Sequence, residues 1–413
     1  MKNKLMKINR YHIISFLFIL FIFIIFTTTI GNGLTYKKDE IKEIYSAYIN
    51  GDYSYVNKAK SAILTGKETL QTLDSVIPRK NDMINAYGLV QKALGRRYIN
   101  DAADSSKDIV KLKNGQITFI VNKNDELIEK SINNATDFSR YLETKGIDYL
   151  FIQAPHKINP KNNLLPAGVK DYSNANADAF LKGIEANGVN TFDLRDEMDN
   201  QDLDHYSMFF NTDHHWKPAA GLWAAREICK KLNSNFGFSI DTSVLDSDKF
   251  TSTVYKDAFL GSEGKRIGKY YAGVDDIELL IPKYETSLTN YIVKKNGAQL
   301  TRKGSFENTL ISKVNLEPVD YYNKNPYAAY TGGDYPLEVI INKSINGKKI
   351  VFFRDSFSCV VTPFLSLAAC NELHIIDPRY YKGSVRDYID KVNPDIVISL
   401  HNPDYWEAYF AFN

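Results

Sequence analysis

The sequence predicts an α/β fold, in which a mostly parallel sheet with helices on both faces follows one transmembrane helix. Two observations carry this prediction. Short apolar segments alternate with longer helical ones, as they do in parallel sheets, and one apolar run near the N-terminus is long enough to cross a bilayer. The 413 residues are 44% hydrophobic and 24% charged, a globular composition that excludes disordered, collagen-like and rod-shaped chains.

The apolar run predicts a membrane anchor. Residues 16–26 are all Phe, Ile or Leu, and the apolar stretch widens to 13–30. At about 1.5 Å per residue, it reaches across most of a bilayer core. Four basic residues precede it without any acidic one, which favours a cytoplasmic N-terminus: Lys2, Lys4, Lys7 and Arg10. A cleaved signal peptide is the alternative, although it is usually shorter and ends in small residues.

This pattern divides the chain into four predicted parts: a cytoplasmic tail at 1–12, a single-pass signal-anchor at 13–32, a helical stalk at 33–107 and an extracytoplasmic α/β domain at 108–413. The domain has expected strands at 116–121, 148–153, 189–194, 349–353, 372–376 and 395–400. Its expected helices are 126–145, 175–187, 217–235, 359–369 and 384–392. Residues from about 239 to 346 lose this periodicity and predict an insertion of hairpins and loops.

Composition excludes several functional classes. Lys and Arg number 51 against 49 Asp and Glu, with no long basic block, so nucleic acid is not an expected partner. The three cysteines, Cys229, Cys359 and Cys370, match neither a disulfide scaffold nor a zinc site. The 27 Tyr and 23 Phe exceed what a core needs. They indicate either aromatic packing or a surface that stacks on carbohydrate.

Two short stretches contain the residues for acid–base and nucleophilic chemistry. In Asp213-His214-His215, an aspartate two residues before a histidine can accept the Nδ1 hydrogen and leave Nε2 as a general base. This favours His215 over His214 as the base. Ser356 lies where an apolar strand turns into a predicted helix, at the sheet edge where α/β proteins bind ligands. Its position predicts a nucleophile with its own N–H directed toward an oxyanion.

The chain resembles the DHHW family, which is similar to the SGNH-hydrolase-like polysaccharide O-acetyltransferases of the alginate-modifying type. Four stretches carry the resemblance: TDHHW, DSFS, FLGSEGKRIGKYYAGVDDIELLIPK and HIIDPRYY. It covers residues from about 114 onward and implies an SGNH-like, flavodoxin-like fold with a permuted motif order. It also implies Asp213, His215 and Ser356 as the acid, base and nucleophile.

The resemblance is incomplete at the oxyanion hole. Arg354 stands where ordinary SGNH enzymes have glycine, and a second glycine donor is not identifiable. Asn402 follows a predicted strand where the family has an asparagine donor, but it also fits a plain turn residue. Lys157, in a loop that resembles the family's P-x-K segment, is expected to contact an anionic sugar or to be an ordinary solvated lysine.

These observations predict an extracytoplasmic enzyme that O-acetylates a surface or secreted polysaccharide through an acyl-serine, without a cofactor or metal. A polytopic membrane acyltransferase is the partner that the resemblance implies as acetyl source. A carbohydrate esterase with the same triad and a non-catalytic glycan-binding envelope protein are alternatives. A manganese phosphoesterase of the Asp-His-His type is a weaker one, because such enzymes need additional metal-binding aspartate motifs upstream of that triplet.

Overall fold

The computed structural model describes residues 10–51, 55–101, 108–345, 347–403 and 412. Contacts divide the chain into two compact units, 1–84 and 85–413. Most of the predicted cytoplasmic tail lies outside the described residues. Residues 85–101, which the sequence assigned to the stalk, belong to the second unit, where Gly88 packs so closely on Ile267 that a Cβ at Gly88 would lie 1.9 Å from the Ile267 carbonyl oxygen.

The first unit is helical. It contains α1 (Arg10–Tyr36), α2 (Lys38–Ile49) and α3 (Tyr55–Asp74), and α4 (Lys80–Ala93) crosses the boundary to the second unit. Helix α1 is long and apolar enough to cross a membrane, and only 6% of its most apolar window is buried. By length and composition α1 is thus a possible anchor or signal sequence.

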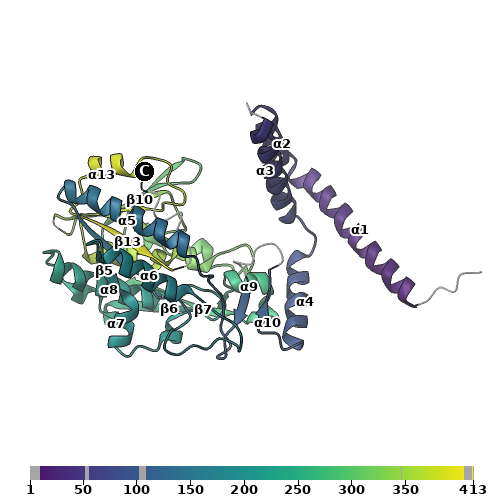
Figure 1. Ribbon diagram of the computed structural model, residues 1–413, viewed down its shortest axis with the longest axis horizontal. Helices are drawn as coiled ribbons and strands as arrows, with labels where there is room; N and C mark the ends of the chain where they lie inside the picture. The colour runs from purple at the N-terminus through teal and green to yellow at the C-terminus, as the bar shows by residue number, and fades with distance from the viewer. Residues whose placement is uncertain (1–9, 52–54, 102–107, 346, 404–411, 413) are drawn as a thin grey trace, which may run out of the picture. The chain divides into compact units, whose positions relative to one another are not determined.

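The second unit (Figure 1) is built on a mixed sheet. Its eight strands have the order β5-β4-β13-β11-β12-β10-β8-β9. Five neighbouring strands, β5 to β12 in that order, pair in parallel, and the remaining three pair antiparallel. The strands are β4 (Asp148–Gln153), β5 (Asn190–Asp193), β8 (Leu288–Val293), β9 (Gln299–Gly304), β10 (Leu337–Asn342), β11 (Lys349–Arg354), β12 (Glu372–Ile376) and β13 (Ile396–His401).

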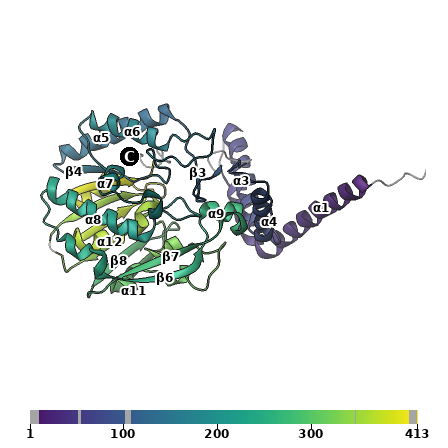
Figure 2. The same ribbon diagram turned by 90° about the horizontal axis from the view of Figure 1, so that it is seen from below.

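Helices cover both faces of this sheet (Figure 2). Strand β11 explains why, because its apolar residues alternate between the faces: Ile350 and Phe352 join one core, and Val351 and Phe353 join the other. One face packs on α8 (Pro218–Asn235) and α12 (Thr362–Ala368), and the other on α5 (Asp125–Thr144), α6 (Ser173–Glu185) and α13 (Val385–Val392). The predicted α/β architecture is confirmed.

Two expectations about the sheet are corrected. The segment predicted as a strand at 116–121 contains β3 (Ile117–Phe119), which pairs in a small antiparallel sheet with β1 (Tyr98–Ile99) and β2 (Ile109–Lys111) and stays outside the main sheet. The expected insertion at about 239–346 lies only partly outside the main sheet. It contains the hairpin of β6 (Phe250–Phe259) and β7 (Asp275–Pro282), but also β8, β9 and β10, which extend the main sheet.

Short elements complete the second unit and shape the edge of the sheet. The α-helices among them are α7 (Leu194–Asn200), α9 (Ser262–Ile267), α10 (Lys269–Ala272) and α11 (Phe306–Leu310). The 3-10 helices are η2 (His205–Met208), η3 (Thr242–Leu245), η4 (Ser247–Lys249), η5 (Lys313–Asn315), η6 (Pro326–Ala329) and η7 (Ser356–Val360).

Candidate active site

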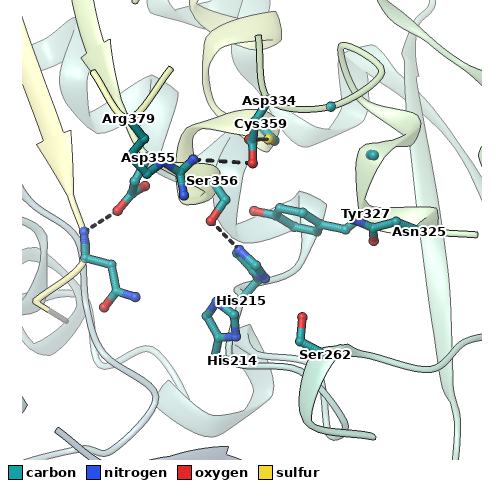
Figure 3. Close-up of a pocket in the computed structure, with 13 residues that line it drawn as sticks. His214, His215, Ser262, Asn325, Tyr327, Asp334, Asp355, Ser356, Cys359 and Arg379 are labelled. Atoms are coloured by element: carbon teal, nitrogen blue, oxygen red, sulfur yellow. Dashed lines mark hydrogen bonds and ion pairs between the residues drawn. The ribbon is translucent and has the colours of Figure 1, made fainter. Parts of the chain in front are cut away.

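The predicted site residues meet at the carboxyl edge of the parallel strands. Asp355 follows β11 and caps the 3-10 helix η7, which begins at Ser356. Asn402 directly follows β13. His215 comes from the loop between η2 and α8. Together they line a cavity of about 340 Å³ (Figure 3). The loop of His215 reaches the edge where β11 ends, so residues 141 positions apart in sequence come into contact here.

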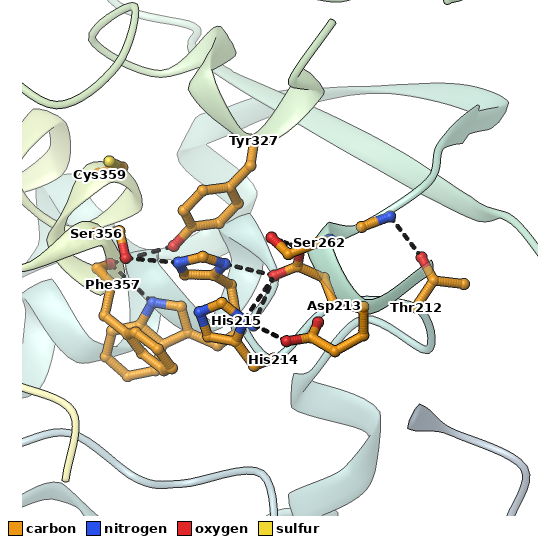
Figure 4. Close-up of polar contacts among 12 residues, drawn as sticks. Thr212, Asp213, His214, His215, Ser262, Tyr327, Ser356, Phe357 and Cys359 are labelled. Carbon is orange, nitrogen blue, oxygen red and sulfur yellow. Dashed lines mark hydrogen bonds and ion pairs between the residues drawn. The ribbon is translucent and has the colours of Figure 1, made fainter. Parts of the chain in front are cut away.

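His215 connects the serine to the aspartate (Figure 4). Its Nε2 lies 2.7 Å from Ser356 Oγ, and its Nδ1 contacts Asp213 Oδ1. A carboxylate can only accept, so Nδ1 carries the hydrogen and Nε2 accepts the serine hydroxyl. The same Asp213 oxygen accepts the backbone N–H of His215 at 2.9 Å. This is the arrangement that a general base and its nucleophile require.

Helix α9 holds the aspartate in place. Ser262 donates its backbone N–H and its hydroxyl to Asp213 Oδ2, at 2.6 and 3.0 Å. Gly261 permits this approach, since a Cβ there would lie 2.3 Å from Asp213 Cβ and 2.4 Å from the Thr212 carbonyl oxygen. The glycine in the GSEG segment is therefore required by close packing of two chain segments.

Aromatic residues fix the imidazole of His215. Tyr327 stacks on it with a centroid separation of 4.3 Å, and the fully buried Trp216 donates its indole N–H to the Phe357 carbonyl at 2.9 Å. Residues 216 and 357 each follow a proposed catalytic residue directly, so this hydrogen bond joins the two loops. The geometry is thereby fixed before any substrate arrives.

Electrostatics favour a neutral base beside an ionised acid. Burial, and to a smaller extent the neighbouring His214, lower the pKa of His215 despite the opposing charge of Asp213. Burial acts to raise the pKa of Asp213, but the imidazoles of His215 and His214 and the hydrogen bonds from His215 and Ser262 hold it well below its usual value. At neutral pH, His215 is thus ready to take a proton.

A pH profile tests this arrangement. His215 must be neutral to act as a base, and its pKa lies below the ordinary histidine value of about 6.5. As pH falls, we expect activity to persist through 6.5 and to be lost only at lower pH. The measurement is kcat/KM for an activated acetyl ester between pH 4.5 and 9. If kcat/KM fell to half of its plateau value at a pH above 6.5, the assignment of His215 as the base would be contradicted.

The turn that begins at Ser356 differs in part from its prediction. Ser356 begins the 3-10 helix η7, whereas the α-helix begins at Thr362. Asn402 lines the cavity, and its backbone N–H donates to Asp355 Oδ2 at 2.7 Å. Asp355 also accepts the N–H of Phe357, and burial raises the pKa of its carboxyl to about 6. Asp355 therefore ties the asparagine to the serine turn.

Arg354 does not stand in for the missing glycine donor. It is buried, forms an ion pair with Asp334, and donates to the Gly333 carbonyl at 3.2 Å. Asp334 lines the cavity together with Arg379, whose guanidinium lies 3.3 Å from it and 2.6 Å from Asp377. Arg354 thus helps to form the cavity wall by holding Asp334 in place.

Lys157 lies neither at a sugar-binding surface nor in solvent, the two positions expected for it. It is fully buried, and its Nζ donates to the carbonyls of Ile117 and Asp213, both at 2.7 Å, and of Asn211 at 3.4 Å. Burial lowers its pKa to about 8. The correction has a simple cause: Lys157 is directed inward to hold the loop of Asp213, so it faces neither solvent nor a sugar.

Removing this amine is expected to destabilise the domain. Lys157→Met removes this donor from the buried Ile117 and Asp213 carbonyls, at a cost of about 1–3 kcal/mol each, so we expect the free energy of unfolding to fall by about 2–6 kcal/mol. Denaturant unfolding measures the loss. Lys161→Met is the matched control, because that side chain is 71% exposed and its change should stay within about 0.5 kcal/mol. Equal losses in both variants would contradict the structural role.

Several residues of the site carried no sequence signal of their own. Four such residues line the cavity: Ser262, Tyr327, Asp334 and Arg379. Of these, only Ser262 and Arg379 lie in the stretches that carry the family resemblance.

Potential metal ligands are also present, since atoms of Asp213, His214 and His215 lie within 4.8 Å of one another. Both ring nitrogens of His215 are already engaged, by Asp213 and Ser356, so a metal ion would have to displace these contacts.

Comparison with known proteins gives a family match for part of the second unit. Residues 117–254 match the family described as "SGNH hydrolase-like domain, acetyltransferase AlgX". The predicted resemblance is confirmed. The SGNH-like match supports an enzyme, and it begins at β3 and includes the Asp213 and His215 loop. Comparison with curated protein sequences gives no match.

Solved structures share the SGNH-like fold. Bacillus cereus PatB1, solved with a sulfonyl adduct, is 22% identical with a TM-score of 0.61, and the match covers 74% of this chain and 98% of PatB1. A DHHW family protein from Eubacterium siraeum is 17% identical with a TM-score of 0.52, covering 74% of this chain and 93% of that protein. At these identities the likeness concerns the fold.

Proposed function

We propose that this protein is a membrane-anchored, extracytoplasmic serine acyltransferase that O-acetylates a cell-surface or secreted polysaccharide. The observation that carries the proposal is the 2.7 Å contact of His215 Nε2 with Ser356 Oγ inside a lined cavity, with Asp213 on the other ring nitrogen. The match to an SGNH hydrolase-like acetyltransferase family supports acetyl transfer, and polysaccharide as the acceptor follows from that likeness.

The geometry supports a two-step mechanism. In the first step, His215 takes the Ser356 proton while Oγ attacks the acetyl carbon, and the imidazolium, stabilised by Asp213, returns that proton to the leaving group. In the second, a sugar hydroxyl attacks the acetyl-serine, its proton passes to His215 Nε2, and the proton then goes to Ser356 Oγ as the ester bond breaks. The Ser356 N–H and Asn402 are the proposed oxyanion donors.

Location determines where the acetyl group comes from. If α1 is an uncleaved anchor with a cytoplasmic N-terminus, the cavity lies outside the cytoplasm, away from acetyl-CoA. A polytopic membrane acyltransferase that passes acetyl groups across the membrane is the proposed partner. The proposed reaction itself uses side chains and backbone N–H groups of this chain.

Acetyl content of the surface polysaccharide tests the proposed direction of the reaction. We expect mass spectrometry to find less O-acetyl in cells that lack the protein, and no recovery when Ser356→Ala is supplied instead of the wild type. An esterase with the same triad predicts the opposite change, a rise in acetyl content on deletion. A non-catalytic glycan-binding protein predicts that Ser356→Ala restores the wild-type content.

A further inference from the structure

A buried arginine and a cavity aspartate form a charged pair at the wall of the proposed active site. Arg354 stands where ordinary SGNH enzymes have glycine, and it is only 1% exposed. Burying a guanidinium is costly unless an opposite charge and hydrogen bonds compensate it. Here Asp334 Oδ1 is the opposite charge, and the Gly333 carbonyl accepts a hydrogen bond at 3.2 Å. The buried arginine thus fixes the position of the Asp334 carboxylate.

The backbone before Asp334 fixes it as well. Thr331, Gly332 and Gly333 have φ angles of 61°, 93° and 134°, all in the left-handed region. A β-branched residue rarely adopts such an angle, so Thr331 holds the chain in a costly conformation. Thr331 is fully buried, and its N–H donates to the Leu310 carbonyl at 2.7 Å. The loop between η6 and β10 is therefore held in a shape that presents Asp334 to the cavity.

One oxygen of this carboxylate is open to the cavity. The side chain of Asp334 is 25% exposed and lines the same cavity as Ser356 (Figure 3). Its Oδ1 contacts Arg354 and accepts from the Cys359 thiol at 3.5 Å. Its Oδ2 has the Arg379 guanidinium at 3.3 Å and accepts no hydrogen bond from the described residues. Because a carboxylate oxygen can accept about two hydrogen bonds, Oδ2 has room for a donor from a ligand.

Charge determines which ligand group this oxygen can bind. Burial acts to raise the pKa of Asp334, but the guanidiniums of Arg354 and Arg379 hold it below its usual value. Asp355 is a second carboxylate in the cavity lining. Arg379 is the one lysine or arginine among the described lining residues, and Asp377 already pairs with it at 2.6 Å. A hydroxyl can thus donate to Asp334 Oδ2, whereas a carboxylate on the ligand would be repelled.

We propose that Asp334 accepts a hydrogen bond from a hydroxyl of the acceptor, so that the site takes a neutral sugar in preference to a uronate. The inference rests on the proposed function and names its acceptor class. In the transfer step the attacking oxygen bonds to the acyl carbon, the bond from that carbon to Ser356 Oγ breaks, and the attacking hydroxyl's proton passes through His215 to Oγ. The hydroxyl at Asp334 is a different one and keeps its proton. Lys157, which was expected to contact an anionic sugar, is buried outside the cavity lining.

Acceptor preference tests the inference on the wild type alone. The full-length protein in detergent micelles receives 4-nitrophenyl acetate as donor at pH 8, where His215 is neutral and Asp334 is ionised. Glycerol, sodium glycerate and 1-propanol are the acceptors, at equal ionic strength, and mass spectrometry measures the acetyl ester formed. Glycerate has a carboxylate where glycerol has one hydroxymethyl group. We expect glycerol to be acetylated about tenfold faster than either of the others, the worth of one charge-assisted hydrogen bond.

Asp334→Asn tests the residue itself. The amide oxygen can still accept from Arg354, but the charge is lost. We expect the preference over glycerate to fall to about twofold and the preference over 1-propanol to fall about threefold, since a neutral hydrogen bond is weaker. The burst of 4-nitrophenolate, which reports acyl-serine formation, should change by a smaller factor. Asp377→Asn is the matched control, because it also removes a carboxylate from Arg379 but does not line the cavity. It should keep the preference over 1-propanol.

Several results would overturn the inference and leave the proposed acyl-serine chemistry standing. One is a wild type that acetylates glycerate or 1-propanol as fast as glycerol, or that forms the acyl-serine and acetylates none of the three. Another is an Asp334→Asn variant that slows all three equally, or an Asp377→Asn variant that loses the same preferences. If Asp334→Asn does not fold, the wild-type ratios decide. A wild type that forms no acyl-serine would contradict both the inference and the proposed function.

Discussion

Ser356→Ala is expected to lower acetyl transfer by about four to six orders of magnitude, the loss seen when the nucleophile of a serine triad is removed. The physical reason is that Oγ forms the covalent intermediate and lies 2.7 Å from the base. Stopped-flow and steady-state release of 4-nitrophenolate from the acetyl ester measure the effect, and an unchanged unfolding midpoint shows that the variant is folded.

Ser358→Ala is the control for this substitution. Ser358 lies two residues away in the same turn but is fully buried, and its Oγ has no hydrogen-bond partner among the described residues. We expect activity within about threefold of the wild type, because no step uses this hydroxyl. A dead Ser358→Ala beside an active Ser356→Ala would contradict the assigned nucleophile.

Asp213→Asn is expected to reduce kcat by about 10⁴, since an amide cannot fix the tautomer or stabilise the imidazolium of His215 as a carboxylate does. The buried carboxylate also accepts from Ser262, so the variant must first be checked for an intact fold. Combining Asp213→Asn with Ser356→Ala should add almost nothing to the loss from Ser356→Ala, because the groups act as a unit. If the losses in activity of the two single variants multiplied in the double variant, the idea that these groups act as a unit would be contradicted.

The parallel part of the fold was predictable because its strands are buried on both faces. Segments such as 148–153 and 372–376 are short, apolar and separated by helical periodicity, and the structure places β4 and β12 there. The turn at Ser356 was also predictable, since carboxyl ends of parallel strands gather at one edge, and the Asp-x-His spacing marked the loop at Asp213. The contact between them could not be predicted, because the Asp213 loop lies between η2 and α8 and reaches the serine only through the folded path of the chain.

The antiparallel strands were missed for a local reason. Strand β9 alternates exposed and half-buried residues at the edge of the sheet, and β8 carries polar Thr289 and buried Asn290. The Asn290 side-chain amide finds its acceptor only in the folded sheet, where it donates to Glu338 at 2.6 Å. Their place in the sheet depends on such long-range partners, so the periodicity of residues 239–346 indicated loops instead.

The role of Lys157 was unpredictable for a related reason. Lysine is almost always solvated, and only the convergence of the Ile117, Asn211 and Asp213 carbonyls makes burial of its amine tolerable. These carbonyls come from two other segments of the chain. The pairing of His214 with Glu263 depends in the same way on the docking of α9 against the Asp213 loop.

The most direct test of the central claim is to trap the acyl-enzyme. The full-length protein is incubated with 4-nitrophenyl acetate, with and without a metal chelator, quenched in acid and mapped by peptide mass, and a parallel sample receives a sulfonyl fluoride. We predict a single acetyl group on Ser356, insensitive to chelator, and a sulfonyl adduct on the same residue, with neither adduct in His215→Ala. Chelator-sensitive turnover without an adduct, or an adduct on another residue of a folded sample, would contradict the serine mechanism.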